Sequence, residues 1–599
     1  MIYHCEDHTC NYWDEGEKLP ERCPQCGRKL LRANEADMTG DDWTALGNTL
    51  SDAEASDKKR MVDCFRKAAY LGSAWGVCNL GICMEQGNGV EADPVQAFWL
   101  YQQAVEMGSL NAVCCLGVCY EYGIGTAPDA KQAAELYCKA AEYGSPRGQM
   151  LLAHAFHDGI GVEADAAEAV YWVRAAAYQR YGEGMHRLGV CYEYGDGVEQ
   201  NWERAVHWFR EAAESGVSVA MADLGYCYEK GCGVEQSWEQ AFSWYRRGAE
   251  CGYPVSMSNL GLCYKRGYGV EQNWQEAIKW YEQGAQCGDL QSMHNLARCY
   301  ERGEGVEQNE ERALYWYRRS AEGGNGVAMC NLGWCYQRGY GVEQNEDRAL
   351  YWYRRGAEAG SVYCMFYLGW NYSNGVGVKQ NMTEAIRWYT AAAEGGNADA
   401  MHNLGWLYDH GEGVEQDMKK AICWYERAAE QNHPAAMNSL GECYAMGLGV
   451  PRDLETAMEW YRRAAELGEA MADYNMGWHL EQAGKLSEAY AHYRKAADGN
   501  DDSAWWALGR FYENGVVVAQ DGKEARRCYE TGEKLGSVKC KMRLARCKLL
   551  GIGGRRAKKA GLDLCRQALE LAKESSEKED YGYEAEMNLL RRTIAENES

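Results

Sequence analysis

Proline and phenylalanine are scarce in this sequence of 599 residues, with 8 and 7 copies respectively. So little proline excludes a Pro-rich disordered chain, and the 68 glycines do not follow the triplet pattern of collagen. Long apolar runs are absent, because Glu, Asp, Arg or Gly interrupts them every few residues, so we expect no membrane-spanning helix. Basic residues number 63 against 88 acidic ones, and a net charge of −25 repels phosphate backbones, so nucleic acid is not expected as a main partner.

The first residues, from Met1 to Asp7, have neither the basic region nor the apolar segment of a secretory signal. We therefore expect a cytoplasmic protein, in which the 27 cysteines stay reduced. The aromatic residues are unevenly chosen, with 42 Tyr and 22 Trp. This choice indicates many half-buried rings with a polar edge in contact with water.

A repeat of 36 residues organises most of the chain. Its marker is the small residue in the motif Leu-Gly-x-Cys-Tyr, which recurs with few changes of spacing in fifteen units. A period of this length predicts a solenoid, in which each unit buries its apolar face against the next. The small residues are Gly47, Gly81, Gly117, Ala153, Gly189, Gly225, Gly261, Ala297, Gly333, Gly369, Gly405, Gly441, Gly477, Gly509 and Ala545.

Each unit predicts two helices. Apolar residues three and four apart indicate the first helix, and a Gly-x-Gly motif such as Gly267 and Gly269 ends it, because glycine adopts a left-handed C-cap without steric cost. The second helix begins at an Asn, Ser or Asp N-cap such as Asn273 and continues as Ala-x-x-Trp-Tyr-Arg-Arg-x-Ala-Glu. Stacked hairpins of this kind give a continuous core.

Over residues 41–575, the repeated Leu-Gly-x-x-Tyr, Gly-x-Gly-Val and Ala-x-x-Trp-Tyr-x-x-Ala-Ala motifs resemble the Sel-one-like repeat family, a relative of the tetratricopeptide repeats. The resemblance implies an all-α fold, a right-handed α/α superhelical solenoid of about fifteen helix hairpins. It also implies an adaptor or scaffold for other proteins rather than an enzyme. We expect residues 576–599 to form a capping helix over the last repeat.

Residues 1–33 break the repeat and concentrate metal-ligand residues. A Cys-x-x-Cys-Gly turn presents two thiolates to one ion, and two more cysteines precede it. The segment resembles the rubredoxin-like module of rubrerythrins, but its first two cysteines are separated by four residues instead of two, which leaves His8 as an alternative ligand to Cys5. The predicted ligands of this small metal-binding ribbon are Cys5, Cys10, Cys23 and Cys26.

Four thiolates suit zinc or iron. We interpret the group as a structural zinc site, because closed all-Cys sites usually hold together a segment too short for its own core. A redox iron centre is the alternative, and the protein would then be an electron-transfer or metal-sensing protein. Family members associated with β-lactams suggest a third hypothesis, a β-lactam-binding hydrolase, since Ser56 and Ser575 each begin a Ser-x-x-Lys tetrad; no Lys-Thr-Gly motif follows.

An Asn or Asp stands two positions before the small residue in seven units. If the first helices line the concave face of the solenoid, these side chains form a ladder that can hydrogen-bond the main chain of an extended peptide. The alternative is that the amides bond to the neighbouring repeat and are structural. We predict partner binding at Asn259, Asn295, Asn331 and Asn403.

The remaining polar features are interpreted as structural. A cysteine two positions after the small residue recurs in nine units and is predicted to fill the core. Arg pairs such as Arg246 and Arg247 are expected to solvate a helix face and to pair with the repeated Glu. His154, His157 and Asp158 have a spacing typical of metal ligands, but no third convergent ligand is evident in the neighbouring units.

Overall fold

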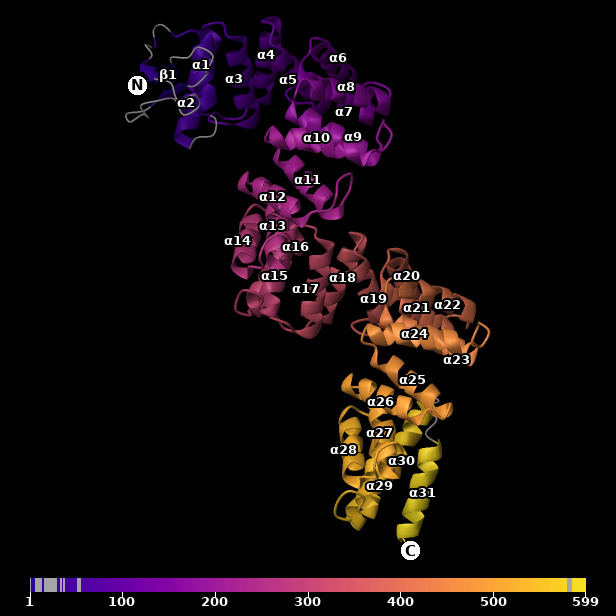
Figure 1. Cartoon of the computed structure of the whole chain (residues 1–599). Helices are drawn as coiled ribbons and strands as arrows, with labels where there is room; N and C mark the ends of the chain where they lie inside the picture. Colours follow the sequence, from indigo (N-terminus) through magenta and orange to yellow (C-terminus); the bar gives the residue numbers. More distant parts are fainter. Residues whose placement is uncertain are drawn as a thin grey trace. The chain divides into compact units, whose positions relative to one another are not determined.

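The computed structural model describes residues 2–5, 13–15, 30–32, 35, 38–50, 55–578 and 584–598. The chain divides into two compact bodies, Met1–Asn309 and Glu310–Ser599, and each is a stack of helix hairpins (Figure 1). In chain order, the helices α1 to α30 give fifteen consecutive pairs, so the described residues confirm the predicted number of units. None of the helices in this described part has the length and apolar content needed to cross a membrane.

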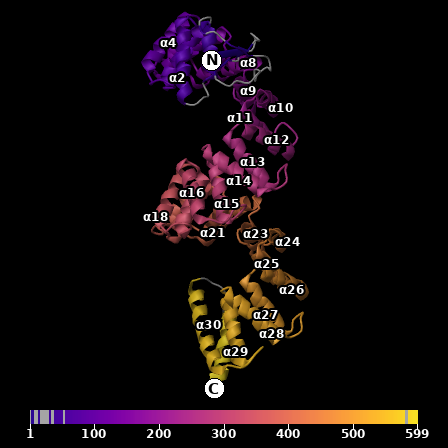
Figure 2. The same cartoon turned by 90° about the vertical axis from the view of Figure 1, so that its left-hand side faces the viewer.

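The first body begins with three short antiparallel strands, in the order β2-β1-β3. The strands are β1 (Ile2–Cys5), β2 (Trp13–Glu15) and β3 (Leu30–Arg32). Helical hairpins follow and stack side by side (Figure 2). The helices of this body are α1 (Gly40–Thr49), α2 (Ala55–Tyr70), α3 (Ala74–Gln86), α4 (Pro94–Glu106), α5 (Leu110–Tyr122), α6 (Ala130–Glu142), α7 (Pro146–Asp158), α8 (Ala166–Tyr178), α9 (Gly182–Tyr194), α10 (Trp202–Glu214), α11 (Ser218–Lys230), α12 (Trp238–Glu250), α13 (Pro254–Arg266), α14 (Trp274–Gln286) and α15 (Leu290–Arg302).

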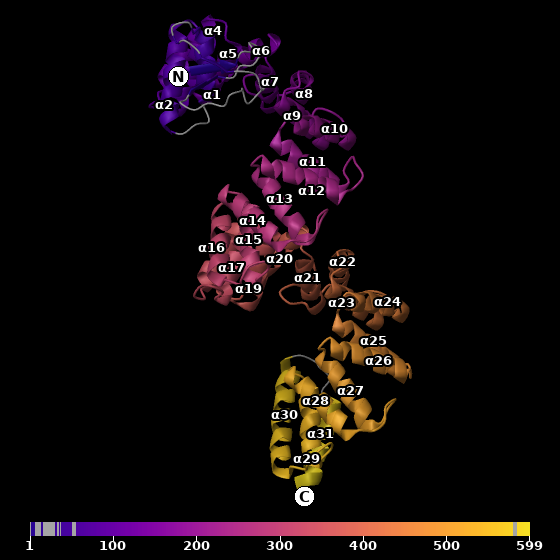
Figure 3. The same ribbon diagram turned by 60° about the vertical axis from the view of Figure 1, so that its left-hand side comes forward.

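The second body is helical throughout its described residues. Its last helix, α31, packs against α29 and α30, and all three lie together in Figure 3. The helices are α16 (Glu310–Glu322), α17 (Gly326–Arg338), α18 (Glu346–Glu358), α19 (Val362–Asn374), α20 (Met382–Glu394), α21 (Ala398–His410), α22 (Met418–Glu430), α23 (Pro434–Met446), α24 (Leu454–Glu466), α25 (Ala470–Gln482), α26 (Leu486–Asp498), α27 (Asp502–Asn514), α28 (Gly522–Lys534), α29 (Val538–Leu550), α30 (Lys558–Lys578) and α31 (Glu584–Glu598).

The loop between the two helices of a unit follows the predicted caps. Gly267 ends α13 with φ +73°, and Gly269 has φ +68°. A side chain at Gly269 is excluded, because its Cβ would lie 2.2 Å from the carbonyl oxygen of Trp238 in the preceding unit. The Gln272 amide then donates to the carbonyl oxygen of Lys265 at 2.8 Å, so one of the free carbonyl groups at the end of α13 is satisfied.

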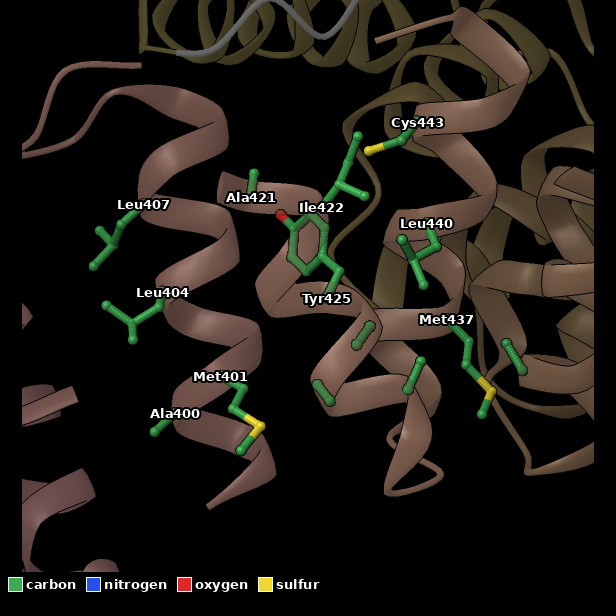
Figure 4. Packing of buried hydrophobic residues seen from close by; sticks show 14 of the residues in the cluster. Ala400, Met401, Leu404, Leu407, Ala421, Ile422, Tyr425, Met437, Leu440 and Cys443 are labelled. Carbon is green, nitrogen blue, oxygen red and sulfur yellow. The ribbon is translucent and has the colours of Figure 1, made fainter. Parts of the chain in front are cut away.

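Glycine and an aromatic ring form the seam of each hairpin. In the unit of α21 and α22, the ring of Tyr425 lies between the first helices of two neighbouring units (Figure 4). Gly405 leaves the space for this ring, since a Cβ there would lie 2.5 Å from Tyr425. Tyr425 is fully buried and donates from its hydroxyl to Asp409 at 3.3 Å. The small residue of the repeat is therefore a steric requirement of the aromatic side chain on the second helix.

The preference for Tyr over Phe at the seam is explained by hydrogen bonds of the tyrosine hydroxyl. The seam tyrosines are fully buried rather than half-buried, and in several units the hydroxyl donates to a polar side chain sixteen residues earlier, at the end of the first helix. A buried phenol needs such a partner. Examples are Tyr101 with Glu85 at 2.6 Å, Tyr137 with Glu121 at 2.6 Å, Tyr245 with Glu229 at 2.9 Å, Tyr353 with Gln337 at 3.0 Å and Tyr529 with Glu513 at 2.7 Å.

The first helices lie on the inner side of each body. First helices of neighbouring units contact each other, as α3 with α5 and α13 with α15 in the first body and α17 with α19 in the second. The second helices of neighbouring units make no contact of similar extent in the described residues. The stack therefore curves toward the first helices, and their free surface is the concave one.

Candidate functional site

The free surface of each first helix is formed by four positions, which lie six and two residues before the small residue and one and five residues after it. This spacing of four, three and four residues places them on one helix face. In α13 they are Val255 and Arg266, which are exposed, and Asn259 and Leu262, which are half-buried. We call this surface the first-helix face. The residues predicted to bind a partner all lie on it and are half-buried, Asn259 and Asn295 in the first body and Asn331 and Asn403 in the second.

The predicted Asn residues differ in their hydrogen bonds. Asn259 makes no side-chain hydrogen bond to another residue in the part of the chain that the structure describes, so its amide is available to a ligand. The Asn295 carbonyl oxygen accepts from Gln291 at 3.2 Å on the same helix. Asn403 hydrogen-bonds to the hydroxyl of Tyr389. These amides therefore offer different numbers of free donors and acceptors on one face.

Two other members of the ladder bond to a neighbouring unit. The Asn79 amide donates to the carbonyl oxygen of Asn48 at 2.8 Å. The Asn475 amide donates to Asn438 at 3.0 Å and to Glu442 at 3.0 Å. At these positions the side chains join adjacent first helices, as the structural interpretation of the ladder expects.

A cavity of about 610 Å³ opens on the first-helix face of the first body. All four face positions of α7, namely Arg147, Leu151, His154 and Asp158, line it, and Arg187 of α9 lines it as well. Leu151 and Arg187 occupy the ladder position that holds Asn elsewhere. An apolar and a charged residue thus replace the Asn side chains where the cavity opens on the first-helix face.

Charged side chains of two units meet in this cavity. His154 Nε2 lies 3.1 Å from Asp158 Oδ2, and His157 contacts Asp158 through Nδ1. The hydrogen bond from His157 is the main reason why the pKa of Asp158 is lowered. His157 Nε2 also lies 3.2 Å from Asp196 Oδ2, which follows α9 in the next unit. The repeat therefore brings a carboxylate of the next unit, Asp196, against His157.

The first-helix face of the second body carries a row of tryptophans. Trp334, Trp370 and Trp406 each follow the small residue of their unit and therefore recur every 36 residues. Trp334 and Trp370 are half-buried, whereas 39% of the Trp406 surface is exposed. Trp478 occupies the same position farther along and is 42% exposed. This row offers large apolar rings with a free N–H edge, which are common anchors in binding interfaces.

The Arg pairs lie on the second helices, away from the first-helix face. The first Arg of a pair meets a Glu, as Arg246 with Glu250 at 3.7 Å, or a tyrosine hydroxyl, as Arg318 with Tyr336 at 3.1 Å. The second Arg stacks over the Trp three residues earlier, a cation–π contact that the sequence analysis missed. The distances to the ring centre are 4.3 Å for Arg247 over Trp244 and 4.4 Å for Arg463 over Trp460. Arg427, which stands at the same position but follows Glu426, lies 4.4 Å from the ring centre of Trp424.

The predicted metal ligands fall largely outside the described residues. This holds for Cys10, Cys23 and Cys26, as well as for His8, and of Cys5 the structure describes only the backbone at the end of β1. The side chains of the two Ser-x-x-Lys tetrads that begin at Ser56 and Ser575 are not fully described either. Within the described ranges, no group of three or more His, Cys, Asp or Glu side chains is arranged to hold a metal ion.

Stacked helix hairpins, with a first-helix face in each body, define the chain as an α/α solenoid repeat protein. The family model of the Sel1 repeat matches thirteen segments, and the chain belongs to the Sel1 repeat family. Proteins of this kind generally act as scaffolds for protein interactions. The matched segments are 76–109, 112–145, 146–181, 182–217, 218–253, 254–289, 290–325, 326–361, 362–397, 398–433, 434–469, 470–501 and 504–537.

Two solved structures are similar to this chain. The chain is 32% identical to c5321, a protective antigen of uropathogenic Escherichia coli strains with an SLR fold, over 75% of this chain and 97% of that one, with a TM-score of 0.50. It is 33% identical to a Sel1 repeat protein from Oxalobacter formigenes, over 41% of this chain and 96% of that one, with a TM-score of 0.38. Among the curated proteins, none matches this chain.

Proposed function

We propose that this protein is a non-catalytic scaffold that binds a peptide or protein partner along the first-helix face. The observation that carries the proposal is the periodic surface itself, which combines half-buried amides such as Asn259 with exposed aromatic rings such as Trp406. An extended segment that follows the stack within one body meets amides or aromatic rings in several of its units. Amides hydrogen-bond its main chain, while rings and hollows between them receive its side chains.

The cavity of the first body fits this role. Its floor is apolar, with Val170 and Val173, whereas its rim carries paired charges and the guanidinium of Arg147. Arg147 makes no ion pair with a carboxylate within the described residues. A site of this composition accepts a side chain with an apolar stem and a polar end. The cavity would therefore fix the register of a segment bound to the first body, whereas the row of tryptophans would supply contact area to a segment bound to the second body.

The test compares face variants with surface variants of the same body. We expect Trp370→Ala/Trp406→Ala to lower the affinity for a partner about tenfold or more, because buried aromatic anchors carry much of the binding energy. The control is Tyr315→Ala/Tyr351→Ala, which removes two rings that are each 52% exposed on the second helices α16 and α18. Partners retained from lysate by the immobilised wild type are identified by mass spectrometry, purified and titrated against each variant.

A parallel variant, Asn259→Ala/Asn295→Ala/Asn331→Ala, addresses the amide ladder. Unchanged helicity by circular dichroism, together with weaker binding, would support the proposal. Equal affinity of a purified partner for wild type, both face variants and the control would contradict it, because the partner would then bind elsewhere. A loss of helicity in the Asn variant would instead assign the ladder a structural role.

We further propose that Cys5, Cys10, Cys23 and Cys26 hold one structural zinc ion. The donor set suits the metal, since four thiolates form a closed tetrahedral site, and strands as short as β1 to β3 need such a link to persist. We expect about one zinc per chain by elemental analysis of the purified protein, and its loss in Cys23→Ser/Cys26→Ser. The control Cys251→Ser/Cys287→Ser changes two exposed thiols of the repeats and should keep the zinc. A red protein with stoichiometric iron would favour the electron-transfer alternative instead.

A further inference from the structure

Two buried cysteines meet where neighbouring first helices of the first body contact each other. Cys78 lies on α3, three positions before Gly81, and Cys115 lies on α5, two positions before Gly117. Their side chains are only 2% and 5% exposed. Both side chains belong to one core cluster, and a hydrogen bond between the two thiols is the main cause that shifts the pKa of each. Because they occupy different positions of the repeat, they are partners across units and not copies of one core position.

A guanidinium group from a third helix completes the cluster. Arg147 of α7 donates from Nη1 to the Sγ of Cys115 at 3.6 Å. Cys115 thus has a thiol donor on one side and a cation on the other, and both stabilise its thiolate. Burial and the carboxylate of Glu85 act in the opposite direction. The balance lowers the pKa of Cys115, mainly through the hydrogen bond from Cys78, and raises the pKa of Cys78.

The same body shows what a cysteine does without this arrangement. Cys114, the neighbour of Cys115 in the chain, is fully buried and contacts the hydroxyl of Ser145 at 3.9 Å. Burial is the main cause that raises its pKa. Cys83 and Cys119, two of the periodic core cysteines, also have a pKa raised by burial, to about 11 and about 12. Cys115 departs from its neighbours because a donor pair faces it.

We propose that Cys78 and Cys115 form an oxidant-sensitive dithiol site, in which a hydroperoxide converts the pair into a disulfide that joins α3 to α5. The Cys115 thiolate attacks one oxygen of hydrogen peroxide, the O–O bond breaks, hydroxide leaves, and a sulfenic acid remains on Cys115. The sulfur of Cys78 then attacks the sulfur of Cys115, the S–S bond forms, and the S–O bond breaks with release of water. Together the two thiols lose two electrons and two protons, and the peroxide is reduced to two molecules of water.

This assignment has a structural consequence for the first-helix face. Oxidation removes the thiolate that Arg147 faces, and Arg147 also lines the cavity of about 610 Å³. The guanidinium then keeps its charge without a sulfur anion beside it. The disulfide also fixes the spacing of two adjacent units, which in a solenoid sets the local curvature.

The second body contains a matched pair without the cation. Cys330 and Cys364 are buried and hydrogen-bonded to each other across the contact of α17 with α19. The Cys364 thiol also contacts the carbonyl oxygen of Gly326 at 3.6 Å. No charged group is among the causes that shift the pKa of either thiol. The pair therefore serves as an internal control that has the thiols and the burial but lacks the guanidinium.

The experiment treats the full chain with hydrogen peroxide, blocks the remaining thiols with an alkylating agent, and maps the peptides by mass spectrometry over time. We expect the disulfide between Cys78 and Cys115 to form about tenfold faster than the one between Cys330 and Cys364. Arg147→Met should remove most of this difference, whereas Arg147→Lys should retain part of it. In Cys78→Ser, the sulfenic acid on Cys115 should persist and react with dimedone.

Two results would overturn the assignment. One is equal rates for the two cysteine pairs in the wild-type chain, since the guanidinium would then have no effect. The other is oxidation of the exposed Cys251 and Cys287 with Cys78 and Cys115 still reduced, since burial would then protect the pair. Circular dichroism of each variant before treatment separates a change of reactivity from a loss of fold.

Discussion

Replacing Gly405 with Ala is expected to destabilise the second body by about 1–3 kcal/mol, which is typical of an overpacked core. The sign of this stability change is informative. Ala is a better helix former than Gly by about 1 kcal/mol, so the same substitution would stabilise a helix without a steric clash. Here a Cβ at position 405 would lie 2.5 Å from two ring carbons of Tyr425. Tyr425 is fully buried, so its ring has no free space into which it can move.

Two of the three units that have Ala in place of the small Gly also have a smaller residue in place of the seam Tyr, whereas the third combines Ala297 with Tyr317. Ala153 takes the place of the small Gly and is followed twenty residues later by Val173, and both lie in one core cluster. Ala545 is likewise followed by Cys565. We therefore expect Tyr425→Val alone to cost about 3 kcal/mol through the cavity it leaves. The double variant Gly405→Ala/Tyr425→Val should be more stable than the sum of the single variants predicts, by about 1 kcal/mol or more.

The measurement is amide hydrogen exchange of α21 and α22 in the four proteins of this cycle, since a repeat array does not unfold as one unit. Protection should fall in both single variants and recover in part in the double variant. Strict additivity of the two single effects would contradict the steric explanation. It would show that Gly405 is required for a reason other than the ring of Tyr425.

The fold was largely predictable from the sequence because a repeat tests each rule many times. The caps show this well. Gly267 and Gly269 were expected to end a helix, and both have the positive φ that the prediction requires. Asn273 was expected to begin the next helix, and its side chain accepts from the backbone N–H groups of Gln275 and Glu276. These signals are local, so one sequence is sufficient to find them.

Contacts between helices were less accessible to sequence reasoning. The aromatic composition indicated half-buried rings, and Tyr228 and Tyr264 are half-buried, whereas the seam residue Tyr425 is fully buried with a carboxylate near its hydroxyl. The unit that has Phe in place of the seam Tyr shows what happens to the carboxylate when the hydroxyl is missing. Phe209 replaces Tyr in one unit, and Glu193, which stands at the position of the carboxylate partner, has a pKa raised by burial. Recognising this pair requires knowledge of which faces of the two helices meet.

The candidate site was predictable in position but not in detail. The Asn ladder was expected on the surface of the first helices, and the half-buried Asn259 and Asn403 lie there. The cavity lies on the same face, where Leu151 and Arg187 interrupt the Asn ladder. It was not predicted, because the sequence was searched for positions that recur in every unit. The contact of Cys115 with Arg147 was missed for a related reason, since these residues belong to different positions of the repeat.

Acidification is expected to destabilise both bodies between about pH 6.5 and pH 4, through a buried histidine in the first body and a half-buried histidine in the second. His294 lies on α15 in the first body and His402 on α21 in the second, at the same position of the repeat. Burial lowers the pKa of each from 6.5 to about 4. A nearby Arg298 adds to the effect at His294, and His433, whose ring centre lies 5.1 Å away, adds to it at His402.

The direction of this pH dependence follows from the number of protons that the folded and unfolded chains bind. Below pH 6.5 the unfolded chain takes up a proton on each histidine, whereas the folded chain does not until the pH approaches 4. The folded state therefore has its full stability above pH 6.5 and loses it as the pH falls through this window. This difference between the pKa of the folded and unfolded states lowers the free energy of unfolding by about 3 kcal/mol for each histidine at the acid end of the window. Asp501 opposes the trend in the second body, because burial raises its pKa to about 6.

The repeat supplies the replacement for this test. Asn438 occupies the position of His402 one unit later and is buried without a titratable group. In His402→Asn, the loss of hydrogen-exchange protection between pH 6.5 and 4 should become smaller in α21 and remain in α15, and His294→Asn should show the reverse. The exposed His207→Asn serves as the control and should leave both bodies unchanged. If neither His402→Asn nor His294→Asn flattens the pH dependence of its own body, carboxylates carry the acid response, since histidine is the side chain whose ordinary pKa lies at the upper limit of this window.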